Sequence, residues 1–171
     1  LEAHTGIVSG NMFGITEGLL TACSPSDPEE ARHRGCGRPV APGDEIRLLK
    51  PGSEDVVAIG EVGALAFRGP NTLVGHYNDP TANESCFTSE GFFRTGDLLR
   101  AFEVDGHLHY AFEGRIKDNI NRGGEKIGAE ELENLIAGHP DLLDARVVAM
   151  PDKIYGEKVC AYVVPRPGRS A

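Results

Sequence analysis

Gly114-Arg-Ile-Lys-Asp-Asn-Ile-Asn-Arg-Gly-Gly-Glu-Lys126 is the stretch that decides how this 171-residue chain is organised. Within thirteen residues it carries four basic and two acidic side chains around a Gly-Gly pair. Adjacent glycines open backbone conformations that are closed to other residues, and they allow close approach to a ligand. A helix-like run over residues 129–137 follows at once, whereas short strand-like runs precede the stretch. The stretch therefore predicts a junction between two domains, with the boundary at Lys117.

The residues before the stretch predict a small antiparallel β unit. Apolar and polar residues alternate over 44–49, and 62–68 is an apolar run that ends at a Gly-Pro pair. Asp105-Gly106 separates two further strand-like runs, which is typical of a hairpin turn. Residues 24–38 are rich in Pro, Asp, Glu and Arg and predict a surface loop.

The residues after the stretch follow a different pattern. Over 129–137, apolar residues share one face and acidic residues fill the first turn, while Gly138 and Pro140 end the helix. Residues 145–149 and 159–164 are apolar and β-branched, so they predict strands. We therefore expect a mixed fold that combines α/β and α+β features.

The charge of the chain argues against two classes of partner. Its formal net charge is −9 at pH 7 and its sequence pI is about 5.1, whereas nucleic acid or an anionic membrane requires a basic face. No apolar run approaches the ~20 residues of a membrane span. The four cysteines form no C-x-x-C pair and no secretory leader is evident, so reduced thiols in a cytoplasmic protein are expected. Both ends predict a piece of a longer polypeptide.

A first candidate site lies near the N-terminus, where a short apolar run ends in a polar turn. Ligands commonly lie at such strand ends in α/β proteins. Thr16 offers a hydroxyl, and Gly14 lets the backbone come close. The Glu17 carboxylate suits Mg²⁺, which binds few protein carboxylates together with substrate phosphates. An ordinary surface turn is the structural alternative.

A second candidate site is Thr95-Gly96-Asp97, which follows two aromatic residues and an arginine. The Asp97 carboxylate could accept hydrogen bonds from both hydroxyls of a ribose. Charge-assisted bonds of this kind contribute about 1.5–3 kcal/mol each. An aspartate in a tight turn is the structural alternative.

Three motifs therefore stand in a fixed order: Phe-Gly-Ile-Thr-Glu (13–17), Arg-Thr-Gly-Asp (94–97) and the stretch 114–126. In this order and at these intervals they resemble the adenylate-forming superfamily of acyl-CoA synthetases, luciferases and nonribosomal peptide adenylation domains. Asn-Arg-Gly-Gly-Glu-Lys and Pro-Asp-x-x-x-Gly-Glu-Lys (151–158) are closest to the aryl acid–AMP ligases of siderophore biosynthesis, of the 2,3-dihydroxybenzoate and salicylate type. The resemblance implies that an aromatic acid and MgATP form an aryl-adenylate. The aryl group then passes to the phosphopantetheine thiol of an aryl carrier protein.

The resemblance also implies roles for individual residues in the nucleotide and acid sites. Thr16 would contact the α-phosphate, and Glu17 would hold Mg²⁺; these two are the catalytic residues. Asp97 would bind the ribose hydroxyls with help from Arg115. The ATP and AMP site would comprise Phe13, Gly14, Thr16, Asp97 and Arg115. Met12 and Leu20 would line the pocket for the acid.

Further roles concern the second half of the chain. Residues 1–116 would be the end of a large AMP-binding domain that includes the small antiparallel β subdomain. Residues 117–171 would begin a small, mobile α+β C-terminal domain, with Lys117 as its hinge. Gly123 and Gly124 would approach the channel through which the acceptor thiol enters.

Two positions bear on the subgroup and the substrate. Thr16 stands where the aryl subgroup often has Ala, and Thr is the choice of the wider superfamily. Leu20 is bulkier than the Val of many dihydroxybenzoate-type members and so favours salicylate, although one methylene separates such substrates by only ~1–3 kcal/mol. Which acid is activated stays open at this stage.

The phosphate loop and the adenylation lysine of the family have no counterpart in these 171 residues. We therefore expect the isolated chain to be inactive. Two alternatives remain: an acyl- or aryl-CoA ligase that uses CoA as acceptor, and a non-catalytic adenylate-binding module.

Overall fold

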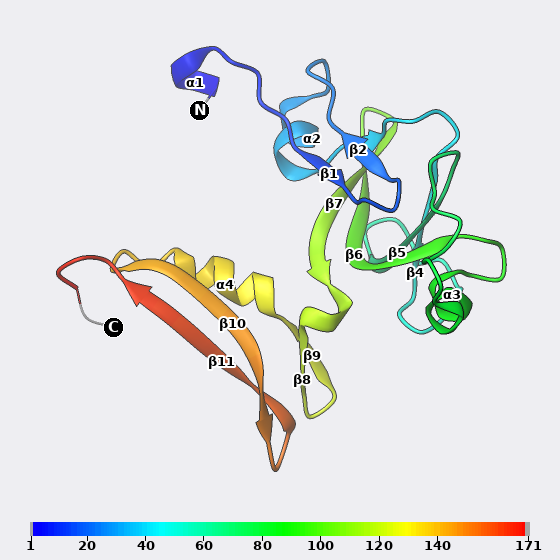
Figure 1. The fold of residues 1–171 in the computed structure, drawn as a ribbon. Coiled ribbons are helices and arrows are strands. Elements are labelled where there is room, and N and C mark those ends of the chain that lie inside the picture. The colour runs from blue at the N-terminus through cyan, green and yellow to red at the C-terminus, as the bar shows by residue number, and fades with distance from the viewer. Residues whose placement is uncertain (1, 170–171) are drawn as a thin grey trace. The chain divides into compact units, whose positions relative to one another are not determined.

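A computed structural model describes residues 2–169 (Figure 1). Its contacts divide the chain into two compact units, Leu1–Glu113 and Gly114–Ala171. Strand β7 crosses this division. The mixed α/β fold with antiparallel sheets was predicted and is confirmed.

The first unit begins with a three-stranded antiparallel sheet in the order β1-β2-β3. Its elements are α1 (Glu2–Thr5), β1 (Met12–Gly14), β2 (Leu20–Ala22), α2 (Glu29–Arg34) and β3 (Arg38–Pro39). Helix α2 lies inside 24–38, so the prediction of a loop throughout that segment is wrong. The helix forms because Ala31 and Arg32 are buried against the unit, a tertiary contact that local composition does not reveal.

A four-stranded sheet in the order β4-β5-β6-β7 makes up most of the first unit. Its strands are β4 (Glu45–Leu49), β5 (Val62–Arg68), β6 (Phe93–Val104) and β7 (His107–Arg115), and α3 (Pro80–Cys86) precedes β6. Asp105 and Gly106 join β6 to β7 with φ angles of 51° and 74°. Positive φ at both turn residues matches the right-handed twist of the strands, as the Asp-Gly pair predicted.

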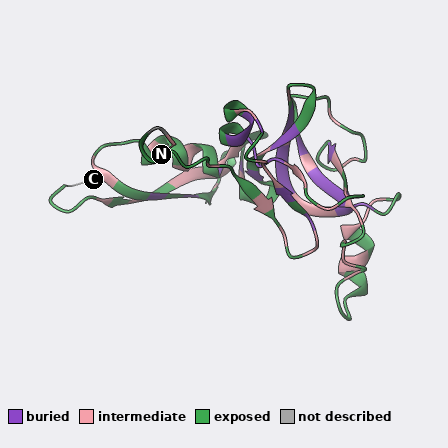
Figure 2. Ribbon diagram, turned by 90° about the horizontal axis from the view of Figure 1, so that it is seen from above, coloured by how far each residue is buried: buried purple, intermediate pink, exposed green. Residues whose placement is uncertain are grey.

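The central strand β5 is buried on both faces. Leu65 and Phe67 point into the main core, where both are at most 1% exposed. Ala66 faces the other way, against Leu49 and Phe92. Burial of each large side chain stabilises the fold by roughly 1.5–3 kcal/mol. Figure 2 shows that buried residues gather on the strands of this unit.

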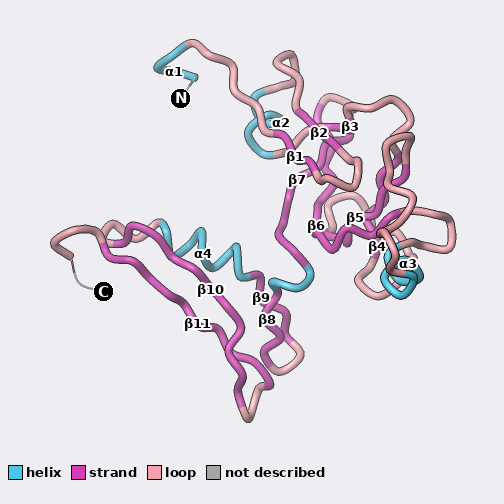
Figure 3. The backbone as a smooth tube through the Cα atoms, in the orientation of Figure 1, coloured by secondary structure: helices cyan, strands magenta, loops and turns pink. Residues whose placement is uncertain are grey.

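The second unit is a four-stranded sheet in the order β10-β11-β8-β9 with one helix packed on it. Its elements are the 3₁₀ turn η1 (Ile116–Asp118), β8 (Asn119–Arg122), β9 (Glu125–Gly128), α4 (Ala129–Ala137), β10 (Leu142–Asp152) and β11 (Gly156–Pro165). Helix α4 has the predicted bounds and lies along β10 (Figure 3). The core here is small: Ile120, Ala129 and Val147 are buried.

The β8–β9 hairpin begins within the stretch 114–126 and extends to Gly128. Ile120 pairs with Ile127, and Arg122 pairs with Glu125. Three of the six charged residues of the stretch therefore lie on two short strands, with the Gly-Gly pair between the strands. The other three lie at the end of β7 and in η1. Lys117 lies in η1, just after the division between the units, and its role as a domain boundary stays a prediction.

Candidate functional site

Thr16 and Glu17 lie at the tip of the hairpin formed by β1 and β2. The amide of Ile15 donates to the carbonyl of Leu19 at 3.0 Å, so the chain reverses over the residues between them. The Thr16 hydroxyl donates to Glu17 Oε2 at 3.0 Å. Thr16 is exposed and Glu17 is half-buried. The predicted polar turn therefore presents a hydroxyl and a carboxylate side by side.

The turn is held against a neighbouring loop by close backbone contact. The amide of Leu73 donates to the carbonyl of Glu17 at 2.9 Å. Gly18 has a φ of 121°, and a Cβ at this position would lie 2.0 Å from the carbonyl oxygen of Asn71. Only glycine fits here. The sequence identified Gly18 as part of a turn but gave no signal of the loop that it meets.

The two faces of the β1–β2 hairpin differ in their exposure. Gly14 pairs with Leu20, so both side-chain positions share one face with Met12. Met12 is 68% exposed and Leu20 is 41% exposed. Phe13 points to the other face, where its ring stacks on Phe112 with centroids 5.6 Å apart. The structure thus brings Met12, Gly14 and Leu20 together on an open apolar face and gives Phe13 a packing contact.

Asp97 lies within strand β6, not in a turn. The register of β6 against β5 shifts between Ala64 and Ala66, which marks a bulge opposite these residues. Bulges commonly re-aim side chains beside functional sites. The Thr95 hydroxyl oxygen accepts a hydrogen bond from the Asp97 amide at 3.0 Å. The Asp97 residue is only 4% exposed.

The Gly-Gly pair forms a two-residue hairpin turn between β8 and β9. Gly123 and Gly124 have φ angles of 64° and 94°, and Arg122 pairs with Glu125 across the turn. Positive φ at both positions strongly favours glycine. The amide of Gly124 donates to Asn121 Oδ1 at 3.1 Å. Both glycines, expected at the thiol channel, therefore lie at an exposed hairpin tip.

Two other predicted residues lie where the chain passes from β7 to β8. Arg115 is the last residue of β7, and Lys117 lies in η1; both are exposed. Asp97 belongs to the first unit and Arg115 to the second. The pairing of Arg115 with Asp97 on a ribose, and the hinge role of Lys117, remain predictions.

A polar network that the sequence did not predict lies around the segment before β1. The Arg32 guanidinium, 7% exposed, pairs with the Glu2 carboxylate and donates to the carbonyls of Ser9 and Asp27. Arg38 pairs with the buried Asp27 at 2.8 Å. The hydrogen bond from Arg32 holds the pKa of Glu2 well below its usual range. This network ties the residues leading into β1 to helix α2.

One group of metal-ligand type occurs in the described part of the chain. Glu2, Glu29 and His33 bring one ligand atom each to within 4.8 Å of one another. Glu2 is already paired with Arg32, which offsets its charge. Glu17, the predicted Mg²⁺ ligand, is not part of this group. A single protein carboxylate accords with Mg²⁺, which keeps several waters and is bound mainly through substrate phosphates.

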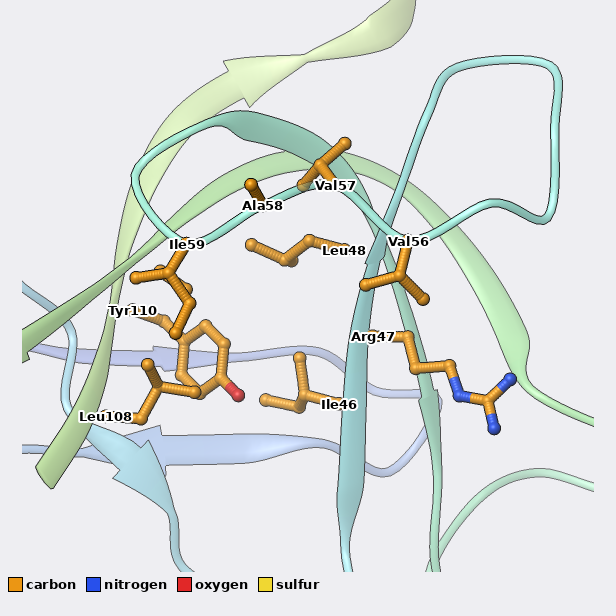
Figure 4. Close-up of a pocket in the computed structure, with 10 residues that line it drawn as sticks. Ile46, Arg47, Leu48, Val56, Val57, Ala58, Ile59, Leu108 and Tyr110 are labelled. Atoms are coloured by element: carbon orange, nitrogen blue, oxygen red, sulfur yellow. The ribbon is translucent and has the colours of Figure 1, made fainter.

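A cavity of about 120 Å³ opens in the first unit beside β4 and β7 (Figure 4). Its walls are mainly aliphatic, and the polar side-chain atoms that Figure 4 shows belong to Tyr110 and Arg47. Burial raises the pKa of Tyr110. None of the residues that line it belongs to the predicted nucleotide, acid or thiol sites, so it has no part in the proposed chemistry.

Comparison with known families gives two matches. Residues 1–77 match the model described as AMP-binding enzyme, and residues 131–171 match the AMP-binding enzyme C-terminal domain. The Phe-Gly-Ile-Thr-Glu turn lies inside the first match. Asp97 and the stretch 114–126 lie between the two, so the roles expected there rest on the motifs alone.

Several characterised proteins are similar to this chain. Pyochelin synthase PchD of Pseudomonas aeruginosa is 48% identical and 2,3-dihydroxybenzoate-AMP ligase of Bacillus subtilis 43% identical, each over 97% of the chain. Salicyl-AMP ligase / salicyl-S-ArCP synthetase of Mycobacterium tuberculosis is 44% identical over 95% of the chain. The chain spans about 30% of the length of the first two relatives and 28% of the third.

Solved structures agree with the fold. ATP-bound MatB from Rhodopseudomonas palustris superposes with a TM-score of 0.84 at 29% identity, over 99% of this chain and 33% of that one. A search of the helices among residues 2–169 finds none with the length and apolar character of a membrane span.

Proposed function

Because the chain belongs to the AMP-binding enzyme family, we propose that it is part of an enzyme that activates an aromatic carboxylic acid. The complete enzyme joins the acid to AMP from ATP, releases pyrophosphate, and then passes the aryl group to a thiol. The observation that carries this proposal is similarity over at least 95% of the chain to ligases of dihydroxybenzoate and salicylate.

The β1–β2 hairpin tip would provide the contacts at the reacting phosphate. The Thr16 hydroxyl would turn from Glu17 to donate a hydrogen bond to the α-phosphate, and Glu17 would contribute a carboxylate to Mg²⁺. The adjacent hydroxyl and carboxylate at an open turn fit these tasks. When bound, Mg²⁺ supplies positive charge that offsets the negative charge of the phosphates. The protein's own task is to keep both oxygens in place before the reaction, which avoids reorganisation later.

Met12, Gly14 and Leu20 would form part of the acid pocket, since they share the exposed face of the hairpin. The remaining walls would come from sequence outside this chain. Leu20 favours salicylate over a substrate with a second ring hydroxyl, because a larger side chain leaves less room beside the ring.

Asp97 would bind both hydroxyls of the ribose. Its position in a bulge of β6 fits this role, because the bulge breaks the regular alternation of the strand. Arg115 would assist from the end of β7. The aryl group would then reach the acceptor thiol beside Gly123 and Gly124.

The acceptor is proposed to be the phosphopantetheine thiol of an aryl carrier protein. The name of the Mycobacterium tuberculosis relative, salicyl-S-ArCP synthetase, supports this choice. CoA is the alternative acceptor, since it ends in the same pantetheine arm.

The test is to incubate the complete protein with MgATP and salicylate, 2,3-dihydroxybenzoate, benzoate or a fatty acid, and to detect acyl-AMP by mass spectrometry. We expect adducts with the hydroxybenzoates, salicylate foremost. An adduct with the fatty acid alone would contradict the proposal. Addition of CoA or a phosphopantetheinylated carrier protein then identifies the acceptor.

A further inference from the structure

We propose that Tyr155 and Glu157, at the turn between β10 and β11, are positioning residues for the Gly123–Gly124 turn. Sequence reasoning assigned them no role, and nothing in the proposed site includes them. The inference rests on the proposed function, because it concerns the step in which the aryl group passes to a thiol.

Backbone contacts join the two hairpin tips. The amide of Gly123 donates to the carbonyl of Tyr155 at 2.8 Å. Gly156 pairs with Arg122 as the single ladder position between β11 and β8. The Glu157 carboxylate accepts a hydrogen bond from the Asn121 amide at 2.6 Å. The two residues before the glycine turn and its first glycine are therefore held by the β10–β11 turn.

Side-chain contacts reinforce this connection. The Arg122 guanidinium lies over the ring of Tyr155, 4.2 Å from its centroid. The same ring borders the turn itself, because a Cβ on Gly123 would lie 3.3 Å from Tyr155 Cδ1. An arginine placed over an aromatic face is attracted by the ring's electrons. Tyr155 thus forms one wall of the glycine turn although it is 46% exposed.

The β10–β11 turn has its own internal support. Asp152 Oδ1 accepts hydrogen bonds from the amides of Ile154 and Tyr155 at 2.9 and 3.0 Å. These bonds lower the pKa of Asp152 and keep it ionised. Tyr155 is therefore presented by a preformed turn, which a positioning residue requires.

The step that depends on this arrangement is the transfer to the thiol. The sulfur of a phosphopantetheine thiol bonds to the acyl carbon, and the bond from that carbon to the AMP oxygen breaks. AMP leaves with the electron pair, and the proton of the thiol is released to solvent. Adenylate formation does not involve the acceptor thiol, so the glycine turn should matter much less in that half-reaction.

The test uses the complete protein with salicylate and MgATP, and measures the two half-reactions separately. Pyrophosphate exchange reports adenylation, and thioester formation with pantetheine or CoA reports transfer. For Tyr155→Ala we expect kcat/KM for the thiol to fall about tenfold, because small displacements of positioning groups are costly. Adenylation should stay within about twofold of wild type by the same reasoning.

Conservative variants separate positioning from general stability. Tyr155→Phe keeps the ring and should restore transfer, and Glu157→Gln keeps a carbonyl acceptor and should do better than Glu157→Ala. Tyr162→Ala is the matched control, since Tyr162 is 66% exposed on β11, the strand that Tyr155 directly precedes. Unchanged transfer in Tyr155→Ala, or equal losses in both half-reactions, would overturn the proposal.

Amide hydrogen exchange at Gly123 provides a readout that does not need activity. Faster exchange of the Gly123 amide in Tyr155→Ala than in wild type supports the proposal that the Tyr155 side chain holds the glycine turn. Equal exchange rates in the two proteins overturn it. A complete protein that shows no acid-dependent pyrophosphate exchange would instead remove the proposed function. Amide hydrogen exchange at Gly123 would then test only whether Tyr155 holds the glycine turn.

Discussion

Gly18 is the residue of the proposed phosphate site whose neighbours leave the least room for a side chain. Its φ of 121° is one that other residues rarely adopt, and the backbone of Asn71 and Thr72 lies where a side chain would begin. Thr16 and Glu17 therefore owe their position to a glycine that touches no substrate. The cost of replacing it can be separated into a backbone part and a steric part.

Gly18→Ala should destabilise the complete protein more than Gly52→Ala, as measured by thermal melting. Both glycines have positive φ, which costs another residue about 1–2 kcal/mol. Only Gly18 has atoms within 4 Å of the added Cβ, and overpacking adds about 1–3 kcal/mol. Equal shifts in melting temperature for the two variants would show that the steric contact with Asn71 is unimportant.

Asp97→Ala should lower kcat/KM for ATP by at least about 10–100-fold, since that is the effect of losing one charge-assisted hydrogen bond to the ribose. Steady-state adenylation assays at varied ATP concentration measure this effect. Glu103→Ala is a suitable control, because Glu103 is an exposed carboxylate on the same strand. Undiminished use of ATP by a folded Asp97→Ala protein would remove the ribose role.

At the scale of elements, local sequence signals predicted individual turns and helices better than they predicted how strands pair with one another. The Asp105-Gly106 turn and helix Ala129–Ala137 were both evident, because turn chemistry and a 3.6-residue period are short-range properties. The bulge that holds Asp97 was not evident, since it depends on the register against β5. A tight turn was the structural alternative for this aspartate, whereas it lies inside a strand.

The β8–β9 hairpin was missed for a related reason. Its two strands are four residues each and mostly polar, so the apolar alternation is short. Ile120 and Ile127 were the available signal, because they flank the Gly-Gly pair symmetrically and pair with each other. Helix α2 was missed because its only strong stabilising feature is tertiary: the burial of Ala31 and Arg32.

The Glu2–Arg32 network makes stability depend on pH in a defined direction. The pKa of Glu2 is lowered in the folded protein, chiefly by the hydrogen bond from Arg32. A lowered carboxyl pKa stabilises the fold above the unfolded value of about 4.3, and this contribution is lost as the pH falls further. Wild type should therefore melt at a higher temperature than Glu2→Gln at neutral pH, and the gap should narrow below about pH 4.

A melting-temperature difference between wild type and Glu2→Gln that stays constant down to pH 2 would contradict this account. Glu103→Gln serves again as the control, because Glu103 is exposed and lies on β6, away from this network.

At the scale of the whole molecule, the chain contains two units that would serve different half-reactions. The first carries the proposed phosphate and acid contacts and Asp97, and the second carries Arg115 and the Gly-Gly turn with its supporting hairpin. Because the chain spans about 30% of its relatives' length, we propose that the complete enzyme needs further sequence for catalysis. The isolated 171 residues should accordingly show no pyrophosphate exchange.

Lys117→Pro in the complete protein should impair thioester formation much more than adenylation. Lys117 lies in the short 3₁₀ turn that follows β7, and proline fixes φ and removes the amide donor. If the second domain turns about Lys117 between the two half-reactions, only thioester formation should be impaired. Parallel assays of both half-reactions decide this, and equal loss in the two would remove the hinge role.

Pyrophosphate exchange by the complete protein, measured with and without salicylate, tests the central claim most directly. The account predicts exchange that requires MgATP and the aromatic acid, falls strongly in Asp97→Ala and stays near wild type in Glu103→Ala. Exchange that is absent with every hydroxybenzoate, or that proceeds equally well without an acid, would contradict it.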